Sequence, residues 1–236
     1  MFYTPDVLPE SLSAVLPSGA HASWMSPLTD DLPLHPDEAA HLGLVAHRRR
    51  REFSVGRHLA RQLLGELGES PHPLLSGSGR EPLWPTGIVG SISHTSSGCL
   101  VVVGRDSAFR SIGVDIETPD FLEADLWPEI CTESELSLIE GQLLLPAGLC
   151  AKHLFCAKEA VYKFQYPVTG AFLEFHDVEL LIDLERGSFA ARSRCDKVRD
   201  VIDAAIGKFA LVEGHIVALV FASSSQRVDP PARAGN

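Results

Sequence analysis

The sequence predicts a soluble globular protein that mixes α-helices with β-strands. Two stretches, residues 46–67 and 149–165, repeat apolar side chains three and four positions apart, which is the spacing of a helix with one buried face. Shorter runs, among them residues 99–103 and 111–117, have the apolar alternation or continuity that is typical of strands. Hydrophobic residues make up 45% of the 236 residues and charged residues 22%, so the chain can bury a core beneath a polar surface.

Charge and cysteine content exclude several classes of protein. The net charge of −11 argues against general nucleic-acid binding, which needs a basic field. The five cysteines are scattered and form no CxxC pair, so we expect neither a disulfide framework nor a zinc site, but a reducing compartment. No apolar run reaches the roughly 18 residues of a membrane helix, and the first residues do not resemble a signal peptide. We therefore expect a cytoplasmic protein with no membrane partner.

The first third of the chain holds a confined basic cluster. Residues 1–34 predict an irregular arm or one short strand, and a short helix begins after Leu34. On the helix predicted at 46–67, one flank of the buried stripe carries Arg50, Arg57 and Arg61. These side chains can point in one direction, as binding of a single anionic ligand requires. The alternative is a solvated helical face.

A flexible loop and a strand end add further candidates for anion binding. Arg80 lies in the Gly- and Ser-rich loop at 76–82, and Ser93 and His94 lie at the end of a predicted strand. A histidine flanked by hydroxyl groups can bind phosphate, although an ordinary loop histidine is the alternative.

The strand predicted at 111–117 carries two carboxylates on one face. Apolar residues alternate with Gly113, Asp115 and Glu117, and residues two apart on a strand point the same way, roughly 7 Å apart. The two carboxylates can converge on one cation, and Gly113 leaves room for a ligand near the backbone. A solvated outer face is the alternative.

The helix predicted at 149–165 follows a short helix with a capping box at Thr132–Glu135. Its buried stripe leaves Glu159 and Lys163 together on another face, next to Lys158. An exposed Glu–Lys pair is the alternative. Strands are predicted again between 175 and 221, and residues 223–236 predict a disordered tail.

Together these residues favour phosphate chemistry. Asp115, Glu117 and Glu159 are hard oxygen ligands that suit Mg²⁺, which usually takes further oxygens from a substrate phosphate. The basic residues supply charge for several phosphates. The sequence therefore predicts Mg²⁺-dependent phosphoryl-type transfer on a polyphosphorylated, nucleotide-like substrate, without a Walker A or kinase signature.

Four blocks of the chain, in order, resemble one family. They are Arg49–Phe53 with Gly56-Arg57 and Ala60-Arg61; Gly79–Pro82 with Trp84-Pro85 and Gly90–His94; Gly113–Glu117; and Phe155–Lys163, a WxxKExxxK-like pattern. Their order and spacing are similar to those of the 4′-phosphopantetheinyl transferases of the Sfp/EntD-like type. Phe155 stands where many members have Trp, and Thr95 where many have Ser.

The resemblance implies an α+β fold. It implies a pseudo-dimeric arrangement of two similar halves, each with a small antiparallel sheet packed on a long helix. The N-terminal half would span residues 1–108 and the C-terminal half, with the metal site, residues 109–222, ahead of the tail at 223–236.

The resemblance also implies a reaction. Phosphopantetheine would move from coenzyme A to a serine of an acyl or peptidyl carrier protein, releasing 3′,5′-ADP, as a holo-acyl-carrier-protein synthase of fatty-acid or secondary-metabolite biosynthesis does. Mg²⁺, or Mn²⁺ in its place, would serve as cofactor, and the enzyme would act as a monomer. The alternatives are a non-catalytic module that binds coenzyme A or a carrier protein, and a Mg²⁺-dependent phosphodiesterase that acts on coenzyme A.

Residue roles follow from the same resemblance. The expected metal ligands are Asp115, Glu117 and Glu159. The expected catalytic residues are Glu159, as the base for the serine, Lys163, which offsets charge on the leaving phosphate, and Asp115. The residues expected to bind coenzyme A are Arg49, Arg57, Arg80, Ser93, His94, Lys158 and Lys163, with Arg49, Arg57 and His94 at the 3′-phosphate. From the aromatic residues near 165–173 we also expect Tyr162, Tyr166 and Phe172 to contact the carrier, although Tyr162 and Phe172 could instead be core residues.

Overall fold

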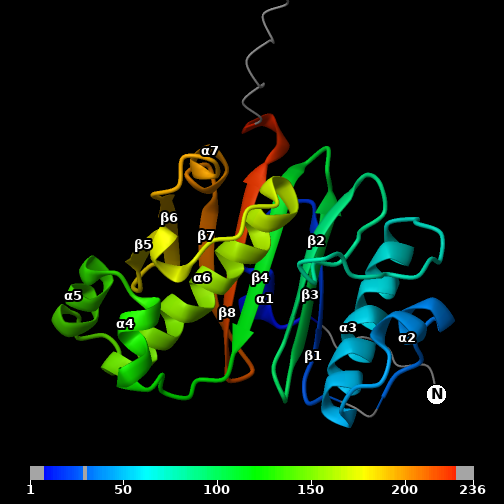
Figure 1. Ribbon diagram of the computed structural model, residues 1–236, viewed down its shortest axis with the longest axis horizontal. Helices are drawn as coiled ribbons and strands as arrows, with labels where there is room; N and C mark the ends of the chain where they lie inside the picture. The colour runs from blue at the N-terminus through cyan, green and yellow to red at the C-terminus, as the bar shows by residue number, and fades with distance from the viewer. Residues whose placement is uncertain (1–7, 29–30, 227–236) are drawn as a thin grey trace, which may run out of the picture.

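Two antiparallel sheets lie side by side at the centre of the molecule (Figure 1). The computed structural model describes residues 8–28 and 31–226. The first sheet has three strands in the order β1 (Ala20–Met25), β3 (Cys99–Arg105) and β2 (Ile88–His94). The second has five, in the order β4 (Phe109–Glu117), β8 (His215–Ser223), β7 (Ile206–Val212), β6 (Ser188–Ser193) and β5 (Val178–Asp183). The predicted α+β class is confirmed.

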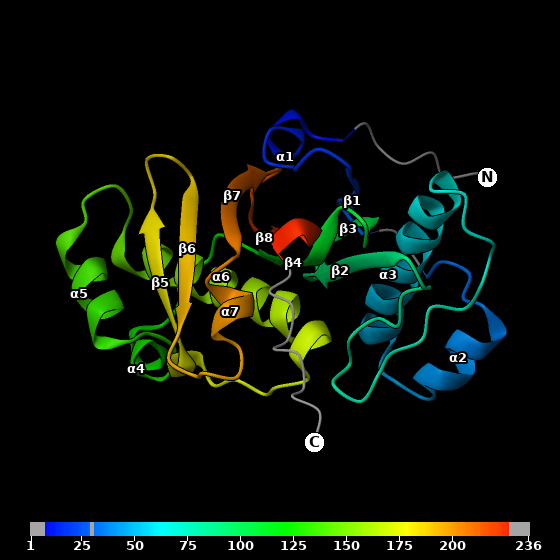
Figure 2. The same cartoon turned by 90° about the horizontal axis from the view of Figure 1, so that it is seen from above.

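One long helix covers each sheet. Helix α3 (His47–Glu66) packs its stripe of Val55, Leu59 and Leu63 against the three-stranded sheet. Helix α6 (Ala147–Thr169) packs Leu154, Val161 and Phe164 against the five-stranded sheet (Figure 2). The shorter helices lie around this frame: α1 (Glu10–Ser13), α2 (Pro36–Leu42), η1 (Ala124–Leu126), α4 (Trp127–Ile130), α5 (Glu133–Gly141), η2 (Phe175–Asp177), α7 (Arg199–Ile202) and η3 (Ser224–Gln226).

The predicted helices have the right positions, but α6 is longer than expected. It continues four residues past Gln165, through Pro167, and ends where Gly170 takes the left-handed conformation, with φ 63°. A proline near the end of a helix removes one backbone bond without stopping the chain from completing its last turn. Gly170 then caps the helix by donating its N–H to the carbonyl of Tyr166, 2.8 Å away.

Serine side chains join the two sheets. Edge strands β2 and β4 run side by side in the same direction, and the Oγ atom of Ser91 accepts a hydrogen bond from the N–H of Val114 at 3.1 Å. Two residues further on, the Oγ atom of Ser93 accepts one from the N–H of Ile116 at 3.2 Å. The hydroxyl groups thus replace the backbone carbonyls that would pair these amides in a continuous sheet.

Strand β4 is buried on both faces, unlike the half-exposed strand that was the alternative reading. Ile112, Val114 and Ile116 pack in the core between the sheets, and the opposite face lies under α6. The expectation that Gly113 leaves room for a ligand is wrong, because a Cβ atom there would collide with the backbone of Ala160 and Phe164. Gly113 instead allows α6 to approach the strand closely.

Other differences lie at the ends of the chain. The expected short strand of the N-terminal arm is β1, whereas α7 was not predicted. Strand β8 runs to Ser223 and η3 covers Ser224–Gln226, so the prediction of a disordered tail is wrong for residues 223–226, and residues 227–236 lie outside the described residues. Strand β4 begins at Phe109, the first residue of the predicted C-terminal half. The likeness of the two halves to each other stays a prediction. No helix in the described part of the chain is long and apolar enough to cross a membrane.

The close contact between α6 and Gly113 predicts an asymmetric response to added methyl groups. Gly113→Ala should lower the free energy of unfolding by about 3 kcal/mol, because the helix backbone must move away from the strand. Gly141→Ala is the matched control, because a Cβ atom there meets nothing within 4 Å, and its effect should stay within about 0.5 kcal/mol. Urea unfolding of both variants measures the difference, and equal stabilities would contradict the packing described here.

Candidate active site

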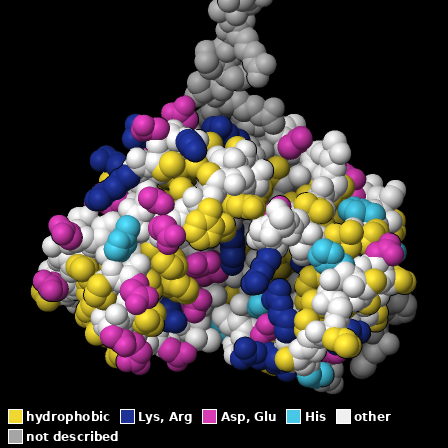
Figure 3. Space-filling view, in the orientation of Figure 1, with side chains coloured by type: hydrophobic (Ala, Val, Ile, Leu, Met, Phe, Trp, Pro, Cys, Tyr) yellow, Lys and Arg dark blue, Asp and Glu magenta, His cyan; other side chains and the backbone are white. Residues whose placement is uncertain are grey.

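A cleft lies where the two sheets meet, and basic side chains gather in the hollow between the two parts of the molecule (Figure 3). One cavity of about 430 Å³, called the main cavity below because Glu159 and Lys163 line it, has the loop after α3 and β2 on one side and α6 on the other. Arg49 and Arg80 face Glu159, Lys163 and their neighbours across it. Residues that are far apart in the sequence therefore meet in one cavity.

A smaller cavity, of about 80 Å³, holds the residues expected at the 3′-phosphate. Arg49, Arg57, Arg80 and His94 line it together with Glu52. Arg49 and Arg80 also line the main cavity, so the two cavities are adjacent. The convergence of three guanidinium groups on so small a space suits an anion of the size of phosphate.

Arg57 is the most firmly held of these groups. It is buried, its Nε donates to the carbonyl of Leu74 at 2.7 Å, and its guanidinium lies 4.2 Å from the centre of the Phe53 ring. Burial lowers the pKa of Arg57 to about 10, which leaves it charged at neutral pH.

The two other arginines of the predicted flank serve different partners. Arg50 pairs with Asp31 at 3.1 Å, and Arg61 pairs with buried Glu38. Of the predicted flank, only Arg57 lines the small cavity, because Arg50 and Arg61 reach acidic groups that the helical wheel does not include.

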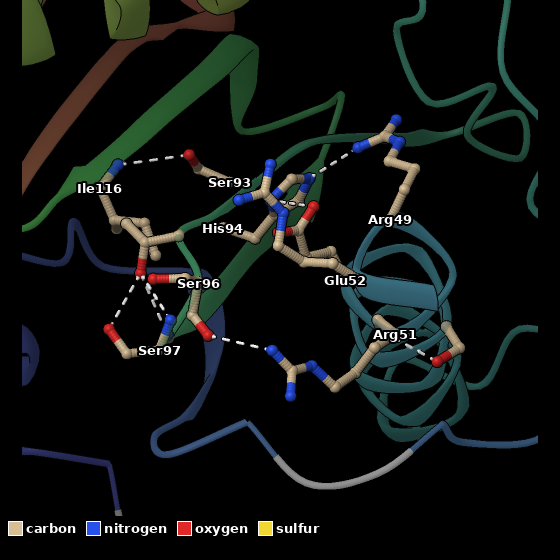
Figure 4. Close-up of polar contacts among 12 residues, drawn as sticks. Arg49, Arg51, Glu52, Ser93, His94, Ser96, Ser97 and Ile116 are labelled. Carbon is tan, nitrogen blue, oxygen red and sulfur yellow. Dashed lines mark hydrogen bonds and ion pairs between the residues drawn. The ribbon is translucent and has the colours of Figure 1, made fainter. Parts of the chain in front are cut away.

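His94 has a defined protonation pattern. Its Nε2 lies 3.0 Å from Nη1 of Arg49 (Figure 4). Because a guanidinium can only donate, Nε2 must accept, and the neutral ring carries its proton on Nδ1. Burial, with the positive charges of Arg49, Lys163 and Arg57, lowers the pKa of His94 to about 4, so the ring is neutral at pH 7. As placed, His94 orients Arg49, and it would need a proton on Nε2 to donate to a phosphate.

Ser93 is the centre of a saturated hydrogen-bond network. Its hydroxyl donates to Oδ1 of Asp115 at 2.8 Å and accepts from the amide of Ile116 and from Nζ of Lys163 at 3.0 Å. A hydroxyl has one proton and two lone pairs, so no capacity is left for a substrate phosphate. In this structure the hydroxyl of Ser93 therefore orients Asp115 and Lys163, and its binding of coenzyme A stays a prediction.

Asp115 and Lys163 form a direct ion pair. Nζ of Lys163 lies 2.6 Å from Oδ1 of Asp115. Burial alone would lower the pKa of Lys163, but the negative charges of Asp115 and Glu159 outweigh it and raise that pKa. The second oxygen of Asp115, Oδ2, is buried and has no hydrogen-bond partner among the described residues. Such an oxygen is free to take a ligand.

The three expected metal ligands, Asp115, Glu117 and Glu159, influence one another's charge but do not form one close cluster. Burial and the charge of Asp115 raise the pKa of Glu117, and burial with the charges of Asp115 and Glu117 raises the pKa of Glu159. Glu117 is paired with Lys152 at 3.2 Å. Across the residues that the structure describes, no group of three or more His, Cys, Asp or Glu side chains is gathered closely enough to hold a metal ion. Two of the expected metal ligands are paired with lysines, Asp115 with Lys163 and Glu117 with Lys152.

Lys158 lies in a different environment from Lys163. It is 3% exposed, and its Nζ contacts Oε2 of Glu135 and the carbonyls of Ile130 and Phe175, each at 2.8 Å. Burial lowers the pKa of Lys158, and Glu135 opposes this. Three acceptors satisfy the ammonium group, and the binding of coenzyme A by Lys158 stays a prediction. It ties α6 to α5 and to the segment before β5.

The aromatic residues expected to contact a carrier form one cluster at the C-terminal end of α6. Tyr162 stacks on Tyr166 with ring centres 5.4 Å apart, and its ring edge meets Phe172 at 6.0 Å. Phe172 is 72% exposed, which excludes a core position for it. Tyr162 and Phe172 also line a cavity of about 250 Å³ that Glu159 borders.

Sequence patterns assign no role in the site to Glu52 or Lys152. They predict Glu135 as a capping residue of α5, but not its ion pair with Lys158 of α6. Lys152 precedes Glu159 by seven residues, two helical turns, and that spacing was the available signal for a common face.

Comparison with known proteins gives a consistent result. Residues 37–104 match the model of the 4′-phosphopantetheinyl transferase N-terminal domain, and residues 111–220 match that of the 4′-phosphopantetheinyl transferase superfamily. The chain is 35% identical over 181 residues to the 4′-phosphopantetheinyl transferase Npt of Nocardia iowensis, covering 75% of this chain and 79% of that protein.

Two further relatives match the chain over shorter stretches. The 4′-phosphopantetheinyl transferase PptT of Mycobacterium tuberculosis is 37% identical over 158 residues, 66% of this chain and 69% of PptT. Enterobactin synthase component D of Salmonella typhimurium is 37% identical over 121 residues, about half of each chain.

The buried pair of Lys158 and Glu135 predicts a large loss of stability when it is broken. Lys158→Met should lower the free energy of unfolding by about 3 kcal/mol, because Glu135 keeps its charge in a buried position. Lys197→Met, the same substitution at an exposed position, is the control. If chemical denaturation finds the two variants equally stable, the pair has no structural role.

The neutral state of His94 predicts a loss of stability in acid. The unfolded chain takes up a proton near pH 6.5 and the folded one only near pH 4, so the free energy of unfolding is unaffected above pH 6.5 and falls below it. Between pH 7 and pH 5 this site should contribute a fall of about 1–2 kcal/mol. Urea unfolding at several pH values measures how the free energy of unfolding falls with pH. This fall should be shallower in His94→Asn and unchanged in His47→Asn, whose ring is exposed. A wild-type slope in His94→Asn would contradict the assignment.

Proposed function

The chain belongs to the 4′-phosphopantetheinyl transferase superfamily, and we propose that it transfers 4′-phosphopantetheine from coenzyme A to a serine of an acyl or peptidyl carrier protein, giving holo-carrier protein and 3′,5′-ADP. The two family models match 37–104 and 111–220, so both walls of the cleft fall within the family. This supports an enzyme of that class.

One observation carries the proposal. The small cavity with three arginines lies next to the cavity of Glu159 and Lys163, because Arg49 and Arg80 line both. A substrate with a phosphate at one end and a pyrophosphate further along can occupy both cavities at once. Coenzyme A has this form, with its 3′-phosphate separated from the pyrophosphate by the ribose.

The charges around Lys163 suit the chemistry of transfer. Lys163 stays protonated because its pKa is raised, so it can offset charge on the departing phosphate. Glu159, whose pKa burial and neighbouring carboxylates raise, is the candidate base for the carrier serine. Ser93 holds Asp115 and Lys163 in their relative positions.

The donor set fits a divalent cation. Asp115, Glu117 and Glu159 offer hard oxygens, and the unpartnered, buried Oδ2 of Asp115 supports a ligand at this position. We propose that these residues hold Mg²⁺ or Mn²⁺, which when bound would neutralise the pyrophosphate and lower the barrier to its cleavage. Lys152 and Lys163 would then share their carboxylates with the cation.

The remaining assignments rest on the same cleft. The cluster of Tyr162, Tyr166 and Phe172, in which Phe172 is exposed, lies next to Glu159 and supports carrier docking at that end. Both walls of the cleft come from one chain, which supports a monomer, and five free cysteines support a cytoplasmic location. Relatives that include enterobactin synthase component D support a role in secondary metabolism.

Mass spectrometry of an apo-carrier protein incubated with the enzyme, coenzyme A and Mg²⁺ tests the proposal. We expect the carrier to gain one phosphopantetheine group, and chelation of the metal to abolish the gain. An unchanged carrier with bound coenzyme A would indicate a binding module, and cleavage of coenzyme A without a modified carrier would indicate a phosphodiesterase.

Lys163→Met and Asp115→Asn should each lower the transfer rate about 100-fold or more, because each removes a charge from the reacting centre. Lys197→Met is again the control, since its side chain is exposed and distant in sequence from both cavities. Transfer at the wild-type rate by Asp115→Asn in Mg²⁺ would contradict the assignment of the centre.

A further inference from the structure

Glu52 is a buried carboxylate in a cavity that otherwise gathers positive charge. It lines the small cavity with Arg49, Arg57 and Arg80. Its Oε2 lies 3.6 Å from Nδ1 of His94, and its Oε1 lies 3.6 Å from Nε of Arg48. A carboxylate repels a phosphate, so its presence in an anion pocket indicates a role toward another side chain.

Glu52, His94 and Arg49, labelled in Figure 4, form a chain of contacts with a defined polarity. Arg49 donates to Nε2 of His94, so the imidazole proton lies on Nδ1, the nitrogen that faces Glu52. At 3.6 Å this contact is longer than a hydrogen bond, but a carboxylate beside Nδ1 favours the tautomer with the proton on that nitrogen. These contacts run from buried Glu52 through His94 to Arg49, which is exposed and lines the cavity.

The partners of Glu52 differ in their exposure. The side chain of Arg48 is 76% exposed, so its pair with Glu52 is screened by solvent. The side chain of His94 is only 27% exposed. The positive charges that act on its ring are those of Arg49, Arg57 and Lys163. Among the described residues around the ring, Glu52 supplies the opposite charge.

We propose that Glu52 is a positioning residue for recognition of the 3′-phosphate. It keeps the proton of His94 on Nδ1, so that Nε2 offers a lone pair that holds the otherwise exposed Arg49 over the cavity before the substrate arrives. Ordering a long arginine in advance reduces the entropic cost of binding. This inference rests on the proposed function, because the 3′-phosphate belongs to coenzyme A.

The first test reads the tautomer directly and needs no activity. Nuclear magnetic resonance of the ¹⁵N-histidine-labelled protein, with His94 assigned from His94→Asn, should show Nδ1 protonated and Nε2 unprotonated. In Glu52→Gln the amide can donate to Nδ1, and we expect the Nε2-protonated form to appear. Arg48→Gln is the matched control, because it removes the exposed partner of Glu52 and should leave the His94 signals unchanged. Unchanged signals in Glu52→Gln would overturn the proposal.

The second test separates positioning from folding. Glu52→Gln should raise the KM for coenzyme A about tenfold and that for dephospho-coenzyme A less than twofold, with kcat nearly constant. Combined with His94→Asn, Glu52→Gln should add little, because both act through Arg49. Equal KM increases for both substrates, or additive effects, would overturn the proposal. If Glu52→Gln does not fold, Glu52→Asp keeps the charge, withdraws the carboxylate, and should give a smaller increase that is again confined to coenzyme A.

The two readouts distinguish this inference from the proposed function. If the tautomer responds to Glu52→Gln but calorimetry detects no binding of coenzyme A by the wild-type protein, the proposed function fails and the link between Glu52 and His94 stands. If coenzyme A binds and the tautomer does not respond, the positioning role alone fails.

Discussion

The hydrogen bonds from two serine hydroxyls to the edge of β4 are the constraint on which the rest of the structure depends. Ser91 and Ser93 project from the same side of β2 because they are two residues apart, and each accepts an amide of the neighbouring sheet. A backbone carbonyl in their place would continue the sheet, whereas a hydroxyl on a side chain can rotate and reach further. The joint therefore holds two separate sheets in register, and Ser93 uses its remaining capacity to orient Asp115 and Lys163.

This joint explains why the site has its composition. Strand β4 is enclosed by core residues on one face and by α6 on the other, so its acidic residues are desolvated where they meet the cleft. Desolvation and mutual repulsion raise the pKa values of Glu117 and Glu159, and Lys163 and Lys152 offset part of the charge. Such a balance of opposite charges in a buried place is typical of functional sites, in which incoming ligands complete it.

Much of the fold could be predicted from the sequence because its periodicities are strong. The stripe of α3, the capping box of α5 and the alternation in β4 are local patterns, and each has its expected structure. The motif residues Arg49, Arg57, Arg80 and His94 do meet in one cavity. Local patterns do not specify partners. Lys158 and Lys163 lie five residues apart on one helix, yet one is buried against Glu135 and the other faces Asp115, because different elements cover the two sides of α6. The sequence predicts Ser93 as a ligand of coenzyme A. Its neighbours in sequence do not show that its hydroxyl accepts a hydrogen bond from Ile116 on β4.

The uninterrupted course of α6 has a geometric consequence. Glu159, Lys163 and Tyr166 belong to one helix whose final turn includes Pro167 and closes at Gly170. At about 1.5 Å per residue, Tyr166 lies about 10 Å along the helix axis from Glu159. No loop lies between the two residues to change that distance. The helix therefore fixes the distance between the carboxylate of Glu159 and the ring of Tyr166. If a carrier docks on these rings, as we propose, its serine would have to span this fixed interval to reach Glu159.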